Sequence, residues 1–392
     1  MSESDGDFAM ARSVWCLALA LMAQGAAAEE AAPYPDLASW GEALFFDVNL
    51  SQNRTQACAT CHDPATGFAD PRETVLGHAI SLGDDGASLG DRNAPTASYA
   101  GFSPPFGRDA KGAWVGGQFL DGRAATLADQ AKGPPLNPLE MGLPDVATAA
   151  ARLRENPQYV ATLAALFPQA PASDEAFFDA MAQAIAAYEA TPEFAPFDSK
   201  YDRFLRGEAK LTDQEELGRV LFFSNQFTNC NQCHQLKPQG GAEGETFTNY
   251  AYHNIGVPEN TAVRAGNGTA PGTVDAGLAA NPAVAGAATE RGKFKVPTLR
   301  NVAVTGPYMH NGVFADLRTV ILFYNTYNTT VPARKINPET GQLFAAPEVP
   351  ETLSLTELES GPALDDQRID ALVAFLNTLT DARYEPLLQS AP

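Results

Sequence analysis

The sequence is poor in several residue types, and these shortages exclude some classes of protein. Lys and Arg number 26 against 47 Asp and Glu, which gives a formal net charge of -21. A nucleic-acid-binding protein needs a basic face, so this balance argues against a nucleic-acid partner. No apolar run reaches the roughly 20 residues that a membrane-spanning helix requires. We therefore expect neither a nucleic-acid partner nor a membrane anchor.

Cysteine, histidine and tryptophan are also scarce, with five, five and three copies in 392 residues. A chain of this length can bury a full core without disulfide bonds. Hydrophobic residues make up 45 % and charged residues 19 % of the chain. This composition is that of an ordinary globular protein and excludes wholesale disorder, and the length predicts two domains.

The first 28 residues resemble an export signal. An apolar run from Val14 ends in Ala26-Ala27-Ala28, small residues that favour cleavage before Glu29. The acidic start from Met1 does not suit a signal, and a start at Met10 fits better. An uncleaved anchor is the alternative. We predict a signal peptide over residues 1–28 and a soluble periplasmic protein.

Four of the five cysteines form two Cys-x-x-Cys-His pentads, and the fifth, Cys16, lies in the signal. This pentad is the attachment motif of haem c: the thiols form thioethers and the adjacent histidine binds the iron. Disulfides or a four-cysteine zinc site are alternatives, but neither explains a histidine after both pairs. The residues are Cys58, Cys61 and His62 in the first pentad and Cys230, Cys233 and His234 in the second.

A repeated segment precedes the pentads, Gly41-Glu-Ala-Leu-Phe-Phe46 before the first and Gly218-Arg-Val-Leu-Phe-Phe223 before the second. Each lies in a helical pattern, and long Gly- and Pro-rich stretches separate the helices. We predict a mainly α protein with two cytochrome-c-like haem domains and long irregular loops. The predicted domains are 29–195 and 196–392, and the predicted helices are 37–46, 147–166, 174–189, 213–223 with Thr212 as N-cap, and 368–379.

Several further motifs resemble the bacterial dihaem cytochrome c peroxidase superfamily. Within it, the sequence is most similar to the branch that completes tryptophan tryptophylquinone in methylamine dehydrogenase. The resemblance covers essentially the whole mature chain. Its motifs are Arg92-Asn-Ala-Pro-Thr96, Phe294-Lys-Val-Pro-Thr-Leu-Arg-Asn301, Gly306-Pro-Tyr-Met-His-Asn-Gly312, Phe197-Asp-Ser-Lys-Tyr-Asp-Arg203, Glu245-Thr-Phe-Thr-Asn249, Tyr252-His-Asn-Ile-Gly256 and Lys335-Ile-Asn-Pro-Glu-Thr-Gly341.

The resemblance implies that the first haem, with His62 as its ligand, reacts with peroxide. The distal residues of the family map onto Glu140, Gln130 and Pro134. A carboxylate at this place can move the peroxide proton to the leaving oxygen, which is general acid–base catalysis. Without the resemblance, a loop glutamate would be read as a solvated surface charge.

His78 is a candidate sixth ligand of the first haem. Leu76-Gly-His78 is similar to the Val-Gly-His that supplies a removable ligand in the ordinary peroxidases. The segment from His78 to Arg92 is longer than in those proteins, so the match is imperfect. A histidine in a loop, without iron, is the reading that we favour.

The ligand opposite His234 separates the subfamilies. In the peroxidases a methionine lies 14 residues after the histidine that corresponds to His310, and that position here is Tyr324. A phenolate oxygen favours oxidised iron, whereas a thioether favours reduced iron. Met309 is the competing ligand, and an aromatic core residue on a helix is the other reading of Tyr324.

The resemblance also implies a Ca²⁺ between the haems, bound through Asn93, Thr305 and Pro307. His253 and His310 lie in family motifs and are expected to make structural or haem-propionate hydrogen bonds.

Two positions depart from the family. A tryptophan between the haems is replaced by Leu120, and a second one before the second pentad by Thr228. Leu and Thr cannot carry an oxidising hole as an indole does. Of the remaining residues, Tyr308 is a candidate for this role, and Trp40 and Trp114 are the tryptophans left after the signal.

The resemblance implies a dihaem oxidoreductase that uses H2O2 or O2 to form high-valent iron and oxidises tryptophans of a protein substrate. That substrate would be the precursor of methylamine dehydrogenase. The alternative enzyme is a cytochrome c peroxidase that reduces H2O2 with electrons from a small cytochrome c or a cupredoxin. A dihaem electron carrier is the non-enzymatic alternative, and it requires both irons to be six-coordinate.

Overall fold

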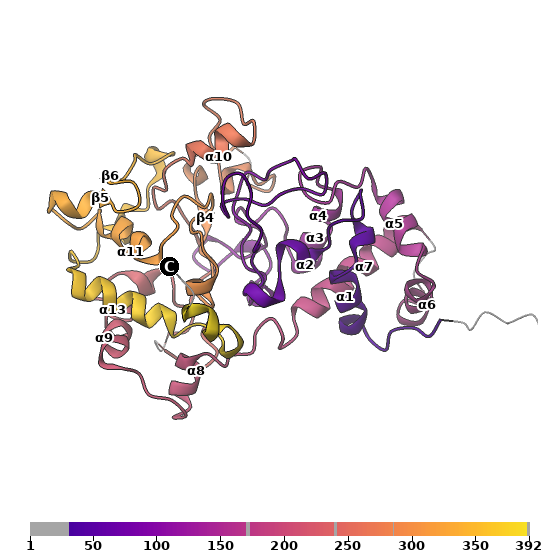
Figure 1. The fold of residues 1–392 in the computed structure, drawn as a ribbon, viewed down its shortest axis with the longest axis horizontal. Helices are drawn as coiled ribbons and strands as arrows, with labels where there is room; N and C mark the ends of the chain where they lie inside the picture. The colour runs from indigo at the N-terminus through magenta and orange to yellow at the C-terminus, as the bar shows by residue number, and fades with distance from the viewer. Residues whose placement is uncertain (1–30, 170–172, 239–240, 285, 390–392) are drawn as a thin grey trace, which may run out of the picture. The chain divides into compact units, whose positions relative to one another are not determined.

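The computed structural model describes residues 31–169, 173–238, 241–284 and 286–389, so the predicted signal peptide lies outside the described residues. The fold is mainly helical, as predicted, with three pairs of two-residue antiparallel strands (Figure 1). Nothing in the described ranges is a helix long and apolar enough to cross a membrane.

The helices are α1 (Leu37–Phe45), α2 (Cys58–Cys61), α3 (Leu127–Ala131), α4 (Gly133–Leu136), α5 (Val146–Arg154), α6 (Pro157–Leu166), α7 (Asp174–Glu189), α8 (Lys200–Leu205), α9 (Asp213–Phe222), α10 (Thr261–Gly266), α11 (Leu317–Asn325), α12 (Leu355–Leu358) and α13 (Asp366–Asn377). The strand pairs are β1 (Gly107–Arg108) with β2 (Trp114–Val115), β3 (Tyr252–His253) with β4 (Phe294–Lys295), and β5 (Ile336–Asn337) with β6 (Gln342–Leu343).

The long helices begin where the sequence pattern predicts. Thr212 caps α9 in a capping box, in which its hydroxyl accepts from the Glu215 amide while the Glu215 carboxylate accepts from the Thr212 amide. One prediction needs correction, because the segment 147–166 is two helices, α5 and α6, and not one. Pro157 has no amide hydrogen to continue α5, and the Asn156 side chain caps the new helix instead.

Two helix pairs carry the hydrophobic cores. Helix α1 packs against α7, and α9 packs against α13 (Figure 1). The apolar residues around the first pair lie between positions 40 and 194, and those around the second pair between positions 201 and 379. The chain from Ala32 onward forms one compact unit, so the domains 29–195 and 196–392 remain a prediction.

The two helix pairs cross at equivalent glycines of the repeated segment. A Cβ atom added to Gly41 would lie 1.9 Å from the backbone oxygen of Ala184, and one added to Gly218 would lie 1.9 Å from that of Ala371. Only glycine permits helix axes to approach this closely. The repeat in the sequence is therefore a repeat in the packing, and each copy places a Cys-x-x-Cys-His pentad after its first helix.

Candidate functional site

The first pentad begins in α2, and its histidine follows directly at the end of that helix. His62 Nδ1 lies 3.1 Å from the backbone oxygen of Phe68, which fixes the ring and leaves Nε2 to bind a metal. Burial lowers the pKa of His62, so the ring is neutral, the form that ligates iron. Burial also raises the pKa of the Cys61 thiol to about 12.

The second pentad repeats this arrangement. His234 Nδ1 lies 3.0 Å from the backbone oxygen of Phe247. Burial lowers the pKa of His234 to about 4 and raises the pKa of the Cys233 thiol to about 12. Burial therefore keeps the thiols of both pentads in their neutral form. Both pentads therefore have the same chemistry.

The two residues whose carbonyls orient the histidines, Phe68 and Phe247, have the same backbone conformation, and a threonine holds the residue before each of them. Phe68 and Phe247 have φ values of 56° and 55°, in the left-handed region. Thr96 Oγ1 donates to the oxygen of the residue before Phe68 at 2.5 Å, and Thr298 Oγ1 to that before Phe247 at 2.7 Å. The two Pro-Thr motifs of the sequence are thus the parts that hold the two histidines in place.

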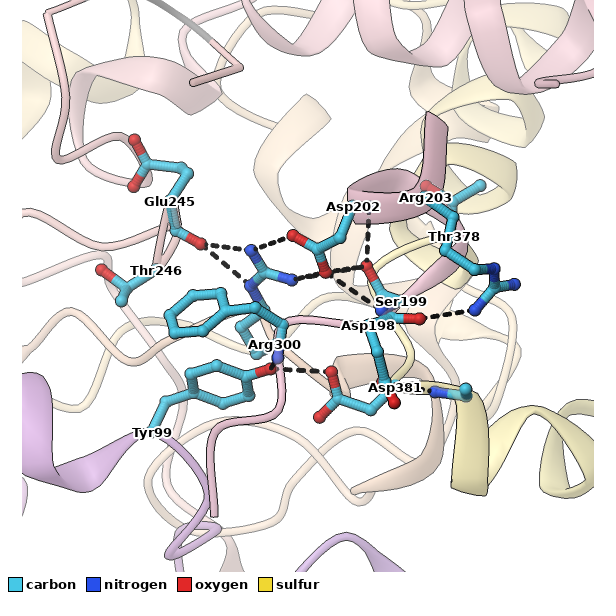
Figure 2. A network of polar contacts seen from close by, with 12 residues as sticks. Tyr99, Asp198, Ser199, Asp202, Arg203, Glu245, Thr246, Arg300, Thr378 and Asp381 are labelled. Atoms are coloured by element: carbon cyan, nitrogen blue, oxygen red, sulfur yellow. Dashed lines mark hydrogen bonds and ion pairs between the residues drawn. The ribbon is translucent and has the colours of Figure 1, made fainter. Parts of the chain in front are cut away.

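A buried polar network joins the two copies (Figure 2). Three residues after each of these threonines the backbone is again left-handed, at Tyr99 and at Asn301. Asp381 accepts a 2.7 Å hydrogen bond from the Tyr99 hydroxyl and a 2.8 Å bond from Asn301 Nδ2. One carboxylate therefore connects the loop behind His62 with the loop behind His234.

Arg300 is the buried cation of the same network. Its guanidinium forms an ion pair with Asp202 and donates to the backbone oxygen of Glu245, at 2.9 Å from Nε and 2.7 Å from Nη2 (Figure 2). It also lies within 5.3 Å of the ring centres of three aromatic residues, Tyr99, Phe197 and Phe247. A buried charge needs such complete pairing. The result is a rigid support behind His234.

A cavity of about 350 Å³ lies in front of His234. Its lining is mostly apolar and includes both cysteines of the second pentad and Tyr324, on α11. Burial raises the pKa of Tyr324, so its phenol is neutral unless a cation binds its oxygen. The spacing argument predicted Tyr324 opposite His234, and the structure brings both residues to one cavity. Met309 lines it as well.

Glu140 follows α4 and lies close enough to the first pentad to act electrostatically on both of its thiols. Its Oε1 accepts a 2.8 Å hydrogen bond from Asn137, and burial raises its pKa. A raised pKa favours the protonated carboxyl, which is the form that can donate a proton. Gln130 lies on α3 and Pro134 on α4. The catalytic roles of these three residues remain predictions.

A family model described as di-haem cytochrome c peroxidase matches residues 35–210. The methylamine utilization protein MauG of Paracoccus denitrificans is 57 % identical over 377 residues, which cover 96 % of each chain. The chain belongs to the di-haem cytochrome c peroxidase family. It is therefore a haem-dependent oxidoreductase, and membership of this family implies two haem c groups; the two pentads stay the predicted attachment sites.

Other members of the di-haem cytochrome c peroxidase family are more distant. Cytochrome c551 peroxidase of Pseudomonas aeruginosa is 34 % identical over 72 % of this chain and 69 % of its own. The crystal structure of the diheme peroxidase BthA of Burkholderia thailandensis is similar with a TM-score of 0.78 at 34 % identity, over 90 % of this chain and 87 % of that chain. These likenesses agree with two cytochrome-c-like domains.

The large cavity in front of His234 suits a haem c group. Its volume is that of a cofactor site, its lining is apolar, and two thiols and a histidine meet there. Buried polar atoms without a partner among the described residues, His310 Nε2 and the Tyr250 hydroxyl, also belong to residues that line it. Such atoms are rare unless a ligand or water satisfies them.

The residues predicted for Ca²⁺ lie partly together. All three, Asn93, Thr305 and Pro307, line the large cavity, and Asn93 and Thr305 also line a small polar cavity of about 10 Å³ together with Asp70. Asn93 Nδ2 donates to the oxygen of Ala79 at 3.1 Å, which leaves the amide oxygen of Asn93 available to a cation. The described residues hold no cluster of three or more His, Cys, Asp or Glu side chains suited to a metal.

His78 is an exposed histidine that also lines this small cavity. Its role as a haem ligand stays a prediction. His253 Nδ1 lies 3.3 Å from Ser354 Oγ, within hydrogen-bond distance. Both His253 and His310 line the large cavity.

The two positions that depart from the family line the large cavity. Leu120 is half-buried, and Thr228 is buried with its hydroxyl donating to the Leu221 oxygen at 2.6 Å. Trp40 is fully buried in the first core, and Trp114 stacks on Phe106. Neither tryptophan lines the cavity.

Sequence reasoning missed the support behind the histidines. The motifs that contain Thr96, Thr298 and Arg300 were recognised only as family signatures. The signal that could have found them is their internal repetition, because Asn93-Ala-Pro-Thr96 and Lys295-Val-Pro-Thr298 occupy the same place in the two copies. Lys295, in the second of these segments, was also missed.

Proposed function

We propose that this protein uses H2O2 to oxidise tryptophans of the precursor of methylamine dehydrogenase and thereby completes tryptophan tryptophylquinone. The observation that carries this proposal is the 57 % identity over 96 % of the chain to a methylamine utilization protein MauG. The export signal over residues 1–28 would deliver the protein to the periplasm, where haem c proteins and this substrate meet.

The two haems, when bound, supply the peroxide-reactive and electron-transfer chemistry. His62 and His234 would each bind the iron of one haem. Glu140, with its raised pKa and its hydrogen bond from Asn137, holds the proton that the departing oxygen of the peroxide needs. Gln130 and Pro134 complete the distal side in this proposal.

Tyr324 supports oxidation of a protein substrate better than turnover with a small donor. A hard anionic oxygen opposite His234 favours the oxidised metal. Its place in the cavity beside Cys230 and Cys233 allows this role. A Ca²⁺ held by Asn93, Thr305 and Pro307 is part of the proposal.

The test begins with EPR of the resting ferric holoprotein. We expect one high-spin and one low-spin signal, both lost on addition of stoichiometric H2O2. The treated protein is then mixed with precursor methylamine dehydrogenase, and quinone absorbance is expected to appear. Two low-spin signals that do not respond to H2O2 until one electron is added would instead implicate His78.

Glu140→Gln is the matched variant, because it keeps the shape of the side chain and removes its titration. We expect its reaction with H2O2 to slow by roughly 10²- to 10⁴-fold, the usual contribution of general acid–base catalysis. Turnover of H2O2 with a reduced cytochrome or cupredoxin, without quinone formation, would favour the peroxidase alternative.

A further inference from the structure

Lys295 is a lysine in the interior without an acidic partner. It lies on β4, where its backbone amide donates to the oxygen of Leu120 at 2.8 Å. Its Nζ donates to the backbone oxygen of Gly117 and lies 3.5 Å from Ser103 Oγ. Within the part of the chain that the structure describes, it forms no ion pair, unlike its neighbour Lys293, which pairs with Glu290 at 3.0 Å.

Two acidic groups near the cavity, Asp121 and Asp275, already form ion pairs with arginines. Asp121 acts on it electrostatically but pairs with Arg92 at 2.7 Å and with Arg123 at 2.9 Å. Asp275, which also lines the cavity, accepts two bonds from Arg92, at 2.6 and 2.7 Å. Among the described residues none forms an ion pair with Lys295, and the one acid that acts on it electrostatically, Asp121, already pairs with two arginines.

Lys295 faces the large cavity. It lines this cavity with His234 and Tyr324, and it lies deep enough that burial lowers its pKa to about 8. As a whole residue, Lys295 is half-buried. A buried ammonium is unfavourable unless a negative charge accompanies it. The cavity is the place from which that charge can come.

A second unpartnered donor belongs to the same lining. His310 Nε2 is buried and has no hydrogen-bond partner among the described residues. Its ring stacks on Phe294, the residue before Lys295, at 3.8 Å between ring centres and an interplanar angle of 13°. An imidazole ring can offer an N–H at this nitrogen to a group in the cavity.

We propose that Lys295 is the counter-ion of a carboxylate side chain of the second haem, with His310 Nε2 as a second donor to the carboxylates of that haem. The inference rests on haem attachment at Cys230 and Cys233 and not on the identity of the protein substrate. It assigns to Lys295 the role of setting the charge, and with it the reduction potential, at this site. A positive charge beside the haem favours its reduced form.

The experiment measures the midpoint potential of the low-spin haem in the holoprotein for Lys295→Met, Lys295→Arg and the control Lys293→Met. Haem content is measured first, so a failure of attachment is seen separately. We expect Lys295→Met to raise the oxidised-to-reduced ratio at a fixed electrode potential at least tenfold, which is about 59 mV for one electron. Lys295→Arg and Lys293→Met should leave it near that of the unmodified protein. An unchanged potential in Lys295→Met would overturn the proposal.

A second measurement uses the unmodified holoprotein and so does not depend on the variants folding. A lysine paired with a carboxylate stays protonated through pH 8, so the potential should not change between pH 7 and 9. A fall in potential centred near pH 8 that Lys295→Arg abolishes would mean that Lys295 has no counter-ion, and would overturn the proposal. Neither measurement needs the protein substrate, so both stand apart from the proposed function.

Discussion

The Tyr99 hydroxyl donates a 2.7 Å hydrogen bond to Asp381, although the two residues are 282 positions apart. Asp381 also accepts from Asn301, and burial raises the pKa of this carboxyl to about 6. Tyr99 belongs to the loop clamped behind His62, and Asn301 to the one clamped behind His234. Asp381 is therefore hydrogen-bonded to the loop behind each of the two pentads.

Tyr99→Phe should destabilise the protein by about 1–3 kcal/mol, because it removes a hydrogen bond from a buried carboxylate. The measurement is denaturant unfolding of the holoprotein. Tyr384→Phe is the control, since its hydroxyl donates at 2.9 Å to a neutral backbone oxygen, that of Pro64. A larger loss of unfolding free energy in Tyr384→Phe than in Tyr99→Phe would contradict the importance of the hydrogen bond between Tyr99 and Asp381.

Tyr324→Met should raise the potential of the second haem and abolish quinone formation, because a thioether favours reduced iron. The reaction of the first haem with H2O2 should persist. Potentiometry and the quinone assay measure these effects. Tyr327→Phe is the control, because Tyr327 donates to the Ile255 oxygen at 3.0 Å and does not line the cavity. Retained quinone formation in Tyr324→Met would argue against Tyr324 as a ligand.

Gly41→Ala and Gly218→Ala should each destabilise one helix pair strongly, because the added methyl group would lie 1.9 Å from a backbone oxygen. We expect losses of at least about 3 kcal/mol, at the upper end of those caused by overpacking. Thermal unfolding measures the loss. Gly107→Ala is the control, since the nearest atom to its added Cβ is 3.9 Å away. If all three variants unfold alike, close helix crossing does not explain the repeated segment.

Glu189→Gln should stabilise the protein at alkaline pH. Burial raises the pKa of Glu189 to about 8 from its ordinary 4.5. The native state then binds the proton more tightly than the unfolded state, so stability is full below about pH 4.5 and falls as the pH rises toward 8. The difference corresponds to about 1.4 kcal/mol for each pKa unit, and Gln does not titrate.

Melting temperatures at pH 5 and pH 8.5 measure this effect. The decrease between the two should be smaller in Glu189→Gln than in the unmodified protein. Glu175→Gln, an exposed position on the same helix, should leave the decrease unchanged. An equal decrease in all three proteins would mean that Glu189 is not a buried acid.

Much of the fold was predictable because its signals are local. Apolar spacing predicted α7 at its observed bounds, and Thr212 was correctly expected to cap α9. The break at Pro157 is also a local effect, and the apolar pattern on both sides concealed it. The pentads predict haem attachment because the two thiols and the histidine must be close in sequence to reach one porphyrin.

Most of the helices, the internal repeat and the prediction of haem attachment follow from local sequence, since each depends on residues a few positions apart. Only the tertiary structure decided which carbonyl orients each histidine, how Asp381 joins the two copies, and that Lys295 faces the cavity without an acidic partner. These features depend on burial and on pairs far apart in the chain. Whether a charge is paired is decided by the neighbours that folding brings to it, and no local pattern records them.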